Sequence, residues 1–280
     1  MAEICQTEHT APGTAALALR YGADAPAEIL WNDTIAGLLA HRTVRALLPD
    51  ALPAALVPTL VAAAQSAASS SNLQAWSVVA VADAGKRQLL AQLAGGQKHI
   101  EQAPLILLWV ADLARASALA AAAGQPAEAL DYMESYTLAA VDAALAAQNA
   151  VVAAESLGLG TVYIGGLRND PQAVAELAGL PEKAVVLFGL VVGWPDPARP
   201  AAIKPRLPQS VVLHHETYEA AGQGARIAAY DATARAFQRG QGQAEVGWSG
   251  LVLARCRDAA ALNGRDRLKA VLRQLGFKLK

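Results

Sequence analysis

Apolar and polar positions alternate along the first two thirds of the chain in a pattern that predicts both strands and helices. Four short, mostly apolar runs are typical of strands covered on both faces; they span residues 76–81, 105–110, 162–164 and 184–192. Helix-like stretches lie between or before them, at residues 33–39, 53–64, 84–93, 134–157 and 171–177. The alternation predicts a layered domain of α/β or α+β class.

The stretch over residues 134–157 is the longest predicted helix. Alanine dominates it, which gives high helix propensity and small side chains that suit close packing. We interpret it as a core helix, with the alternative that it also forms a dimer seam. Asp142, Gln148, Asn149 and Glu155 interrupt its apolar character, so a membrane span is not expected.

The two ends of the chain follow a different pattern. Residues 1–30 are rich in Ala, Pro and Gly without a clear period, so we expect an extension that lies on the surface or is partly disordered. Beyond a proline-rich segment at 196–208, the sequence predicts a short strand at 211–213 and helices at 225–239 and 266–275. This basic tail is interpreted as a lid, or as an arm that packs on a partner subunit.

Composition narrows the function classes. The chain has 280 residues, of which 54% are hydrophobic and 17% charged, so a sizeable core is expected. The formal net charge of −1 gives no indication of nucleic acid or an anionic membrane as partner. Cys5 and Cys256 show no metal or dithiol spacing, and the N-terminus does not resemble a signal peptide. A reducing, cytoplasmic setting is therefore expected.

Two stretches suit an anionic, planar ligand. His41-Arg42-Thr43-Val44-Arg45 carries three cation-capable side chains, and on a helical turn Arg42 and Arg45 would project to the same side. Arginine forks bind phosphate oxygens well, although a solvated basic patch is the simpler reading. In Tyr163-Ile164-Gly165-Gly166-Leu167-Arg168-Asn169, a short strand leads into two glycines, which let backbone approach a flat ligand.

Three further stretches are weaker on their own. The serine-rich run 69–74 resembles a capped turn, the Gly95-Gly96 pair a helix C-cap, and Lys204-Pro205-Arg206 a charged loop. The chain lacks a GxGxxG fingerprint, a P-loop, a GxSxG elbow, paired carboxylates and metal-ligand spacing. We expect neither a catalytic side chain nor a metal, and infer that a bound organic cofactor supplies the chemistry.

Taken in order, these stretches resemble the nitroreductase superfamily, and within it the NADPH-dependent, FMN-containing group. The likeness covers roughly residues 35–240. It lies in residues 41–45, 69–74, 95–99, 147–149, 155–160, 163–169, 187–190, 193–195 and 204–208.

The resemblance implies an α+β fold with a central mixed sheet flanked by helices, in an intertwined homodimer that binds FMN at its interface. It divides the chain into an extension (1–30), an FMN-binding core (31–210) and a C-terminal helical arm or lid (211–280). By likeness, the FMN phosphate and ribityl chain are held by His41, Arg42, Thr43, Arg45, Lys204 and Arg206. The resemblance places near flavin and substrate the residues Ser69, Ser70 and Ser71. It places at the ring or ribityl region the side chain of Gln97, and beside the ring the backbone of Tyr163, Ile164, Gly165 and Gly166.

The implied reaction is ping-pong hydride transfer from NADPH or NADH through flavin N5 to a nitroaromatic, quinone or similar acceptor. Arg239 matches a loop arginine that reads the 2′-phosphate of NADPH, but the basic pair expected after it is replaced by residues 241–245. Asn72, with Ser71 on the substrate side, stands where an apolar aromatic is expected, which affects acceptor preference. The alternatives are a flavin reductase that supplies reduced FMN to a partner, and a flavin-binding protein without turnover.

Overall fold

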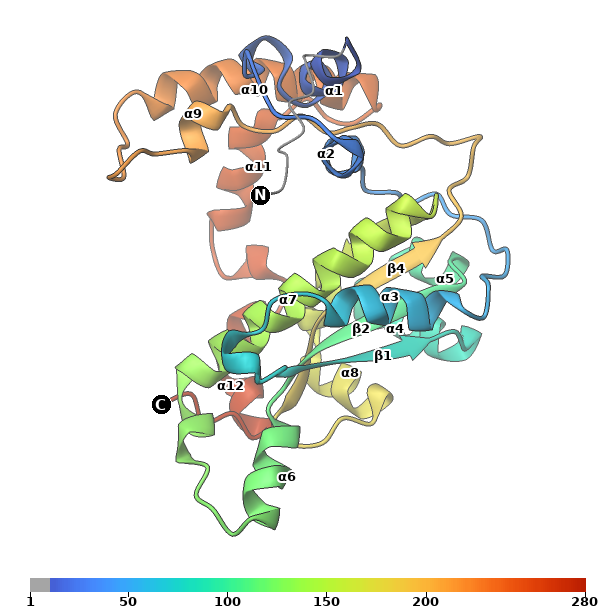
Figure 1. Cartoon of the computed structure of the whole chain (residues 1–280), viewed down its shortest axis with the longest axis vertical. Helices are drawn as coiled ribbons and strands as arrows, with labels where there is room; N and C mark the ends of the chain where they lie inside the picture. Colours follow the sequence, from blue (N-terminus) through green and yellow to red (C-terminus); the bar gives the residue numbers. More distant parts are fainter. Residues whose placement is uncertain (1–10) are drawn as a thin grey trace, which may run out of the picture. The chain divides into compact units, whose positions relative to one another are not determined.

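The computed structural model describes residues 11–280, which fall into two compact units (Figure 1). Residues 43–201 together with 262–280 form one unit, which we call the sheet unit. The described part of residues 1–42 together with 202–261 forms the other, which we call the helical unit.

The sheet unit is built on four antiparallel strands in the order β1-β2-β4-β3. The strands are β1 (Trp76–Val81), β2 (Leu105–Asp112), β3 (Gly160–Ile164) and β4 (Ala184–Gly193). All four correspond to predicted strands. Parallel pairing is limited to a bridge between Thr43 and Thr161, where Val44 N–H donates to the Thr161 carbonyl at 2.9 Å. With its helices, the unit has the α+β architecture expected.

Helices cover both faces of this sheet. On one face α3 (Leu56–Gln65) and α7 (Met133–Ser156) pack against Leu105, Leu107 and Trp109 of β2. On the other face the alternate residues of β2 meet α4 (Ala84–Leu93), α5 (Lys98–Gln102) and α8 (Pro171–Ala178). Because successive strand residues point to opposite faces, two covered faces require the continuous apolar run seen in β2, and the expected double coverage is confirmed.

Helix α7 is a core helix, as expected from its alanines. Its small side chains pack under the sheet; the buried set is Ala139, Ala143, Ala146, Ala147, Ala150, Val151 and Ala154, with Asp142. Among the described residues it is the one helix long and apolar enough to cross a membrane. A different side of the helix leaves Val141 and Leu145 exposed, at 51% and 44%.

The C-terminal tail completes the sheet unit. The unit also contains α6 (Ala114–Ala122), η3 (Glu128–Asp131), η6 (Arg265–Arg267) and α12 (Leu268–Gln274). Beyond α12, Phe277 is 1% exposed, and its ring meets that of Tyr136 edge-on with 5.5 Å between the ring centroids. The Asp131 carboxylate forms ion pairs with Lys183 at 3.4 Å, Lys278 at 2.8 Å and Lys280 at 3.5 Å. The tail is thus fixed by apolar burial and by one carboxylate.

The helical unit contains α1 (Ala11–Tyr21), η1 (Gly22–Asp24), α2 (Asp33–Ala40), α9 (Gln209–Val212), α10 (Gln223–Gly240) and α11 (Gly247–Cys256), with η5 (Ala260–Leu262) at the boundary. The Asn32 side chain caps α2 by accepting from Ile35 N–H at 2.9 Å. The Gln238 side chain bonds both backbone groups of Gly247, which ties α10 to α11.

The structure corrects two expectations from the sequence and adds three helices. The strand predicted at residues 211–213 is wrong, because Val211 and Val212 belong to the short helix α9 that follows Pro208. The N-terminal stretch, expected to lie on the surface or to be partly disordered, contains α1 with a buried Leu17, while residues 1–10 lie outside the described residues. Helices α5, α6 and α11 were not predicted.

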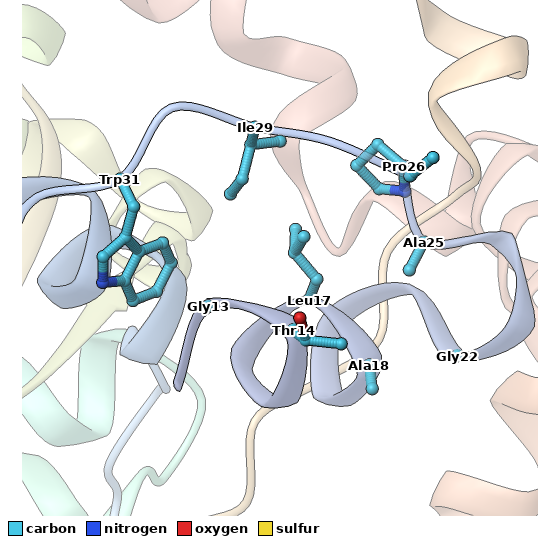
Figure 2. A pocket seen from close by; sticks show the side chains of 10 residues that line it. Gly13, Thr14, Leu17, Ala18, Gly22, Ala25, Pro26, Ile29 and Trp31 are labelled. Carbon is cyan, nitrogen blue, oxygen red and sulfur yellow. The ribbon is translucent and has the colours of Figure 1, made fainter. Parts of the chain in front are cut away.

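A pocket of about 210 Å³ lies within the helical unit, between α1 and the segment that follows it (Figure 2). In Figure 2 Leu17 and Ile29 point toward each other across it, with Trp31 and Pro26 at either side. Trp31 would contact a Cβ at Gly13 at 3.2 Å, so glycine gives the indole its room. The ten residues that line this pocket, all within the described chain, include none of the predicted cofactor residues.

Candidate functional site

Two of the predicted basic segments are brought together in the helical unit. The guanidinium of Arg20, on α1, donates from Nη1 to the Lys204 carbonyl at 2.8 Å and from Nη2 to the His41 carbonyl at 2.7 Å. One side chain thus links segments that are 163 residues apart. Arg42 follows His41 directly and is exposed, so within this unit the backbones of the two segments that carry His41, Arg42, Lys204 and Arg206 are tied to one side chain.

The second of these segments is held by hydrogen bonds to its backbone. Pro205 is buried while Lys204 and Arg206 on either side are exposed. The hydroxyl of Tyr230, on α10, donates to the Pro205 carbonyl at 2.9 Å, and Arg206 N–H donates to the Arg20 carbonyl at 2.9 Å. Fixed backbone therefore presents two cationic side chains to solvent.

The segment after Arg42 continues in the sheet unit and is not helical. α2 ends at Ala40 and Thr43 pairs with Thr161, so the helical turn assumed for Arg42 and Arg45 was wrong. Val44 is buried against β3. A Cβ at position 160 would lie 2.8 Å from the Val44 Cβ, so only glycine fits at this position. Thr43 and Arg45, its neighbours in the extended chain, are exposed beside β3.

The two glycines after β3 open the 3-10 helix η4 (Gly165–Asn169). A Cβ at Gly166 would lie 2.6 Å from both the Ala94 carbonyl oxygen and Gln97 Nε2. Gln97 Nε2 itself donates to the Ala94 carbonyl at 2.8 Å. Gly166 is therefore required for close packing on the turn that carries Gln97, and the structure brings these two predicted residues together.

This turn also shows that the Gly95-Gly96 pair closes a helix. Both glycines have positive φ, 90° and 77°, and Gly96 N–H donates to the Ala91 carbonyl at 2.8 Å, at the end of α4. His99 lies two residues past Gln97. Burial, and then the nearby Arg45 guanidinium, lower the pKa of His99, so Arg45 lies within electrostatic reach of this turn.

Tyr163 and Arg168, on either side of the glycine pair, contact different residues. The Tyr163 hydroxyl lies 3.3 Å from Gln148 Oε1, and its ring meets Phe188 edge-on at 5.2 Å. Arg168 Nη1 donates to the Leu187 carbonyl of β4. The arginine that follows the glycine pair thus stabilises the strand beside it.

The serine-rich loop is held by a buried carboxylate that the sequence did not single out. Asp142, in the middle of α7, is 2% exposed. Its oxygens accept from Ser69 Oγ at 2.7 Å, from Ser70 N–H at 3.1 Å and from Ala75 N–H at 3.2 Å. Ser69 Oγ in turn accepts from Gln74 N–H at 2.8 Å.

The same loop has an uncommon backbone. Ser71, Asn72 and Gln74 have φ of 49°, 54° and 49°, in the left-handed region that glycine normally occupies. Such residues persist only when the surroundings enforce them, and they cluster at functional sites. Asp142 supplies that enforcement, and the loop leaves its small polar side chains exposed.

The sheet order separates the serine loop from the glycine pair. The loop leads into β1 and the glycines follow β3, and these strands are the two opposite edges of the sheet. Three strand spacings, about 14 Å, lie between the edges. A single copy of the sheet unit therefore does not unite Ser69, Ser70 and Ser71 with Tyr163, Ile164, Gly165 and Gly166.

Arg239, predicted to read a 2′-phosphate, has a carboxylate partner in the helical unit. Its Nε and Nη2 donate to the two oxygens of Glu245 at 2.9 and 2.7 Å, a bidentate pair at the end of α10. The pair raises the pKa of Arg239 and lowers that of Glu245. No group of three or more His, Cys, Asp or Glu able to hold a metal occurs among residues 11–280 that the structure describes.

Three residues with evident structural roles at these loops were missed from sequence: Arg20, Asp142 and Glu245. Asp142 left a signal, since it is a carboxylate in the middle of an alanine-rich helix, with alanine or valine at positions 139–141, 143 and 144. Arg20 and Glu245 left none, because their partners are recognised only from the fold.

Comparison with known proteins agrees with these features. Residues 38–194 match the Nitroreductase family, and residues 204–280 match the Nitroreductase family, C-terminal domain. The FMN reductase (NADPH) of Bacillus subtilis is 40% identical over 227 residues, which cover 79% of this chain and 90% of that protein. The oxygen-insensitive NADPH nitroreductase of Salmonella typhimurium is 41% identical over 188 residues, 67% of this chain and 75% of that protein.

Among solved structures, that of B. megaterium NfrA2 matches with a TM-score of 0.83 at 38% identity, and the match covers 89% of this chain and 100% of that one. Sequence motifs, fold and relatives agree, and the chain belongs to the nitroreductase family.

Proposed function

We propose that this protein is an FMN-dependent NAD(P)H oxidoreductase that reduces nitroaromatic, quinone or similar acceptors. The observation that carries the proposal is the link made by Arg20, which brings the backbone of His41 and Lys204 to one guanidinium. The cations of these two segments have the chemistry of a phosphate site. Relatives named FMN reductase and NADPH nitroreductase support the cofactor and the reaction class.

Besides the basic segments, the turn after β3 has features that suit FMN. Gly166 is buried against the turn of Ala94 and Gln97, with no room for a side chain, whereas Gly165 before it is only half-buried and a Cβ there would meet nothing nearer than Arg168 at 3.4 Å. His99 lies two residues past Gln97, and burial and then the Arg45 guanidinium lower the pKa of His99. By resemblance to the family, we assign the phosphate end to the cations at residues 41, 42, 45, 204 and 206, and the ring to residues 163–166.

When bound, FMN supplies the redox chemistry by taking a hydride from NAD(P)H and passing electrons to the acceptor. The chain's own residues bind, orient and stabilise. Backbone at Gly165 and Gly166 would lie beside the ring without a side chain over it, which would leave room for donor and acceptor to bind there in turn. The amide of Gln97 and the cation of Arg45 stabilise negative charge near the cofactor. No side-chain acid or nucleophile is needed.

A homodimer is part of the proposal. The serine loop and the glycine pair lie at opposite edges of one sheet, so a complete site needs Ser69, Ser70, Ser71 and Asn72 from a second copy. The exposed apolar side chains Val141 and Leu145 on α7 are suited to the contact between copies. Residues 31–210 would then form the flavin-binding core and 211–280 the C-terminal arm or lid, of which residues 262–280 pack in the sheet unit, in a cytoplasmic setting.

The donor preference is set at Arg239 in this proposal. A 2′-phosphate must compete with Glu245 for the guanidinium, and the stretch 241–245 offers no other cation. We therefore expect NADH to be used as well as NADPH. Asn72, an exposed amide where an apolar aromatic is expected, would alter the preference among acceptors.

One alternative has a specific observation in its favour. Because a relative is named FMN reductase, free FMN is a second candidate acceptor, with the reduced flavin passed to a partner oxygenase. Steady-state rates with free FMN, a quinone and a nitroaromatic separate the two, and a large preference for the nitro compound excludes the reductase role.

Titration of the purified chain with FMN tests the proposal itself. We expect a yellow protein that keeps about one FMN per chain through gel filtration and elutes as a dimer. A protein that stays colourless after FMN is added contradicts it.

A further inference from the structure

We propose that Arg20 is a positioning residue for the cofactor, which holds the two basic segments at His41-Arg42 and Lys204-Pro205-Arg206 in the arrangement that binds the FMN phosphate. The inference rests on the proposed function, since it takes FMN as the ligand. It gives a role to α1, which precedes the family match that begins at residue 38.

Arg20 is buried, so the loss of water around its charged guanidinium must be offset by hydrogen bonds. Its relative exposure is 4%, and a guanidinium removed from water is costly unless its donors are satisfied. Nη2 serves both the Leu39 and the His41 carbonyls at 2.7 Å, while Nη1 serves the Lys204 carbonyl at 2.8 Å. The planar fork of arginine, with five fixed donors, suits several acceptors at once, which the point charge of lysine does not.

Two of these contacts lie at the C-terminal end of α2. The last carbonyls of a helix have no partner within the helix, and a cation is favourable there. By bonding Leu39 and His41, Arg20 fixes both where α2 ends and the direction in which the chain leaves it. The exposed side chain of Arg42 follows immediately.

The other contacts fix the Lys204 segment from its backbone. Arg206 N–H returns a hydrogen bond to the Arg20 carbonyl at 2.9 Å, so residue 20 bonds this segment through its side chain and its main chain. Tyr230 holds the intervening Pro205. Cations whose backbone is already ordered bind an anion more tightly, because less freedom is lost on binding.

The test compares FMN with riboflavin, which has the same ring without the phosphate. Flavin fluorescence titrations of the full-length chain give Kd for both ligands in the wild type, Arg20→Ala, Arg20→Lys and Arg226→Ala. Arg226 is the matched control, since it donates to the Ser210 carbonyl at 2.8 Å in the same unit. We expect Arg20→Ala to raise the Kd for FMN about tenfold or more, the scale seen when a group that orients metal ligands is removed. Arg20→Lys should have a smaller effect, and the Kd for riboflavin should change little.

The outcomes separate the inference from the function it rests on. Wild-type protein that fails to bind FMN removes the proposed function. If the wild type binds FMN and the Arg20 variants bind it equally well, or lose FMN and riboflavin affinity in the same proportion, Arg20 has no role in placing the phosphate site. If circular dichroism shows that Arg20→Ala does not fold, Arg20→Lys, which keeps the charge, carries the comparison.

Discussion

The Asp142 carboxylate accepts a hydrogen bond from Ser69 Oγ at 2.7 Å, and this contact joins the middle of α7 to a loop 73 residues earlier. The same carboxylate accepts from Ser70 N–H and Ala75 N–H. It thereby holds a loop in which three non-glycine residues are left-handed. By the proposed function this loop faces flavin and substrate, so a buried acid in the helix sets the shape of the site.

The first prediction concerns that acid. Asp142→Asn replaces one acceptor oxygen by an NH₂ group, which cannot accept from Ser69 or Ala75. We expect a loss of about 1–3 kcal/mol in the free energy of unfolding, the cost of an unsatisfied buried donor, and weaker FMN binding. Urea unfolding measures the first. Asp83→Asn is the control, because Asp83 caps α4 through an oxygen that asparagine supplies equally well; equal losses in both variants would contradict the account.

The glycine pair gives a second, matched prediction. A Cβ at Gly166 meets the Ala94 carbonyl at 2.6 Å, whereas a Cβ at Gly165 meets only the flexible end of Arg168 at 3.4 Å. Gly166→Ala should therefore cost about 1–3 kcal/mol of stability through overpacking, and Gly165→Ala less than about 0.5 kcal/mol. Thermal unfolding without flavin measures both. If Gly165 lies along the ring, its alanine variant should weaken FMN binding without this loss, and unchanged affinity counts against that placement.

Glu245 provides a third prediction, on donor choice. Glu245→Gln removes the carboxylate that pairs with Arg239 and leaves the guanidinium for a 2′-phosphate. Because exposed pairs are weak, we expect the ratio of kcat/KM for NADPH to that for NADH to rise about two- to fivefold. Glu219→Gln, which removes an exposed charge elsewhere in the helical unit, should leave the ratio unchanged.

Arg239→Ala is the converse change. It should raise the KM for NADPH more than that for NADH, and it should abolish the gain from Glu245→Gln in the double variant. Equal effects on the two donors would show that Arg239 does not read the 2′-phosphate.

The fourth prediction is a pH dependence of stability. Hydrogen bonds from Lys278, and then from Lys183, lower the pKa of Asp131 to about 2. Because this pKa lies below the unfolded value of about 3.9, the carboxylate stabilises the fold above pH 4, and the stabilisation is lost as the pH falls toward 2. The difference in thermal midpoint between wild type and Asp131→Asn should thus shrink from pH 7 to pH 3. Asp50→Asn, which removes an exposed carboxylate from the same unit, is the control.

Local apolar patterns were enough to predict the layered core. β1 and α4 have their predicted bounds, and α7 differs by one residue at each end. These elements are defined by continuous apolar runs or by helical periodicity, both of which lie within one stretch of chain. Val211 and Val212 show the limit, since β-branched residues favour a strand while their place after Pro208 gives a helical turn.

The candidate site was only partly predictable, because its support comes from distant residues. The basic and glycine-rich stretches are visible in sequence. The carbonyls that Arg20 bonds are 19 to 184 residues away, and Asp142 lies 67 to 73 residues from its partners. Such contacts depend on the fold and on no local pattern.

Anaerobic stopped-flow mixing tests the central claim, that this chain binds FMN and moves electrons through it. Protein reconstituted with FMN is mixed with NADPH or NADH while the flavin absorbance is followed, and a quinone or nitroaromatic is then added. The account predicts rapid bleaching by the donor and full recovery with the acceptor. Bound flavin whose absorbance neither donor changes would show a flavin-binding protein without turnover and would contradict the account.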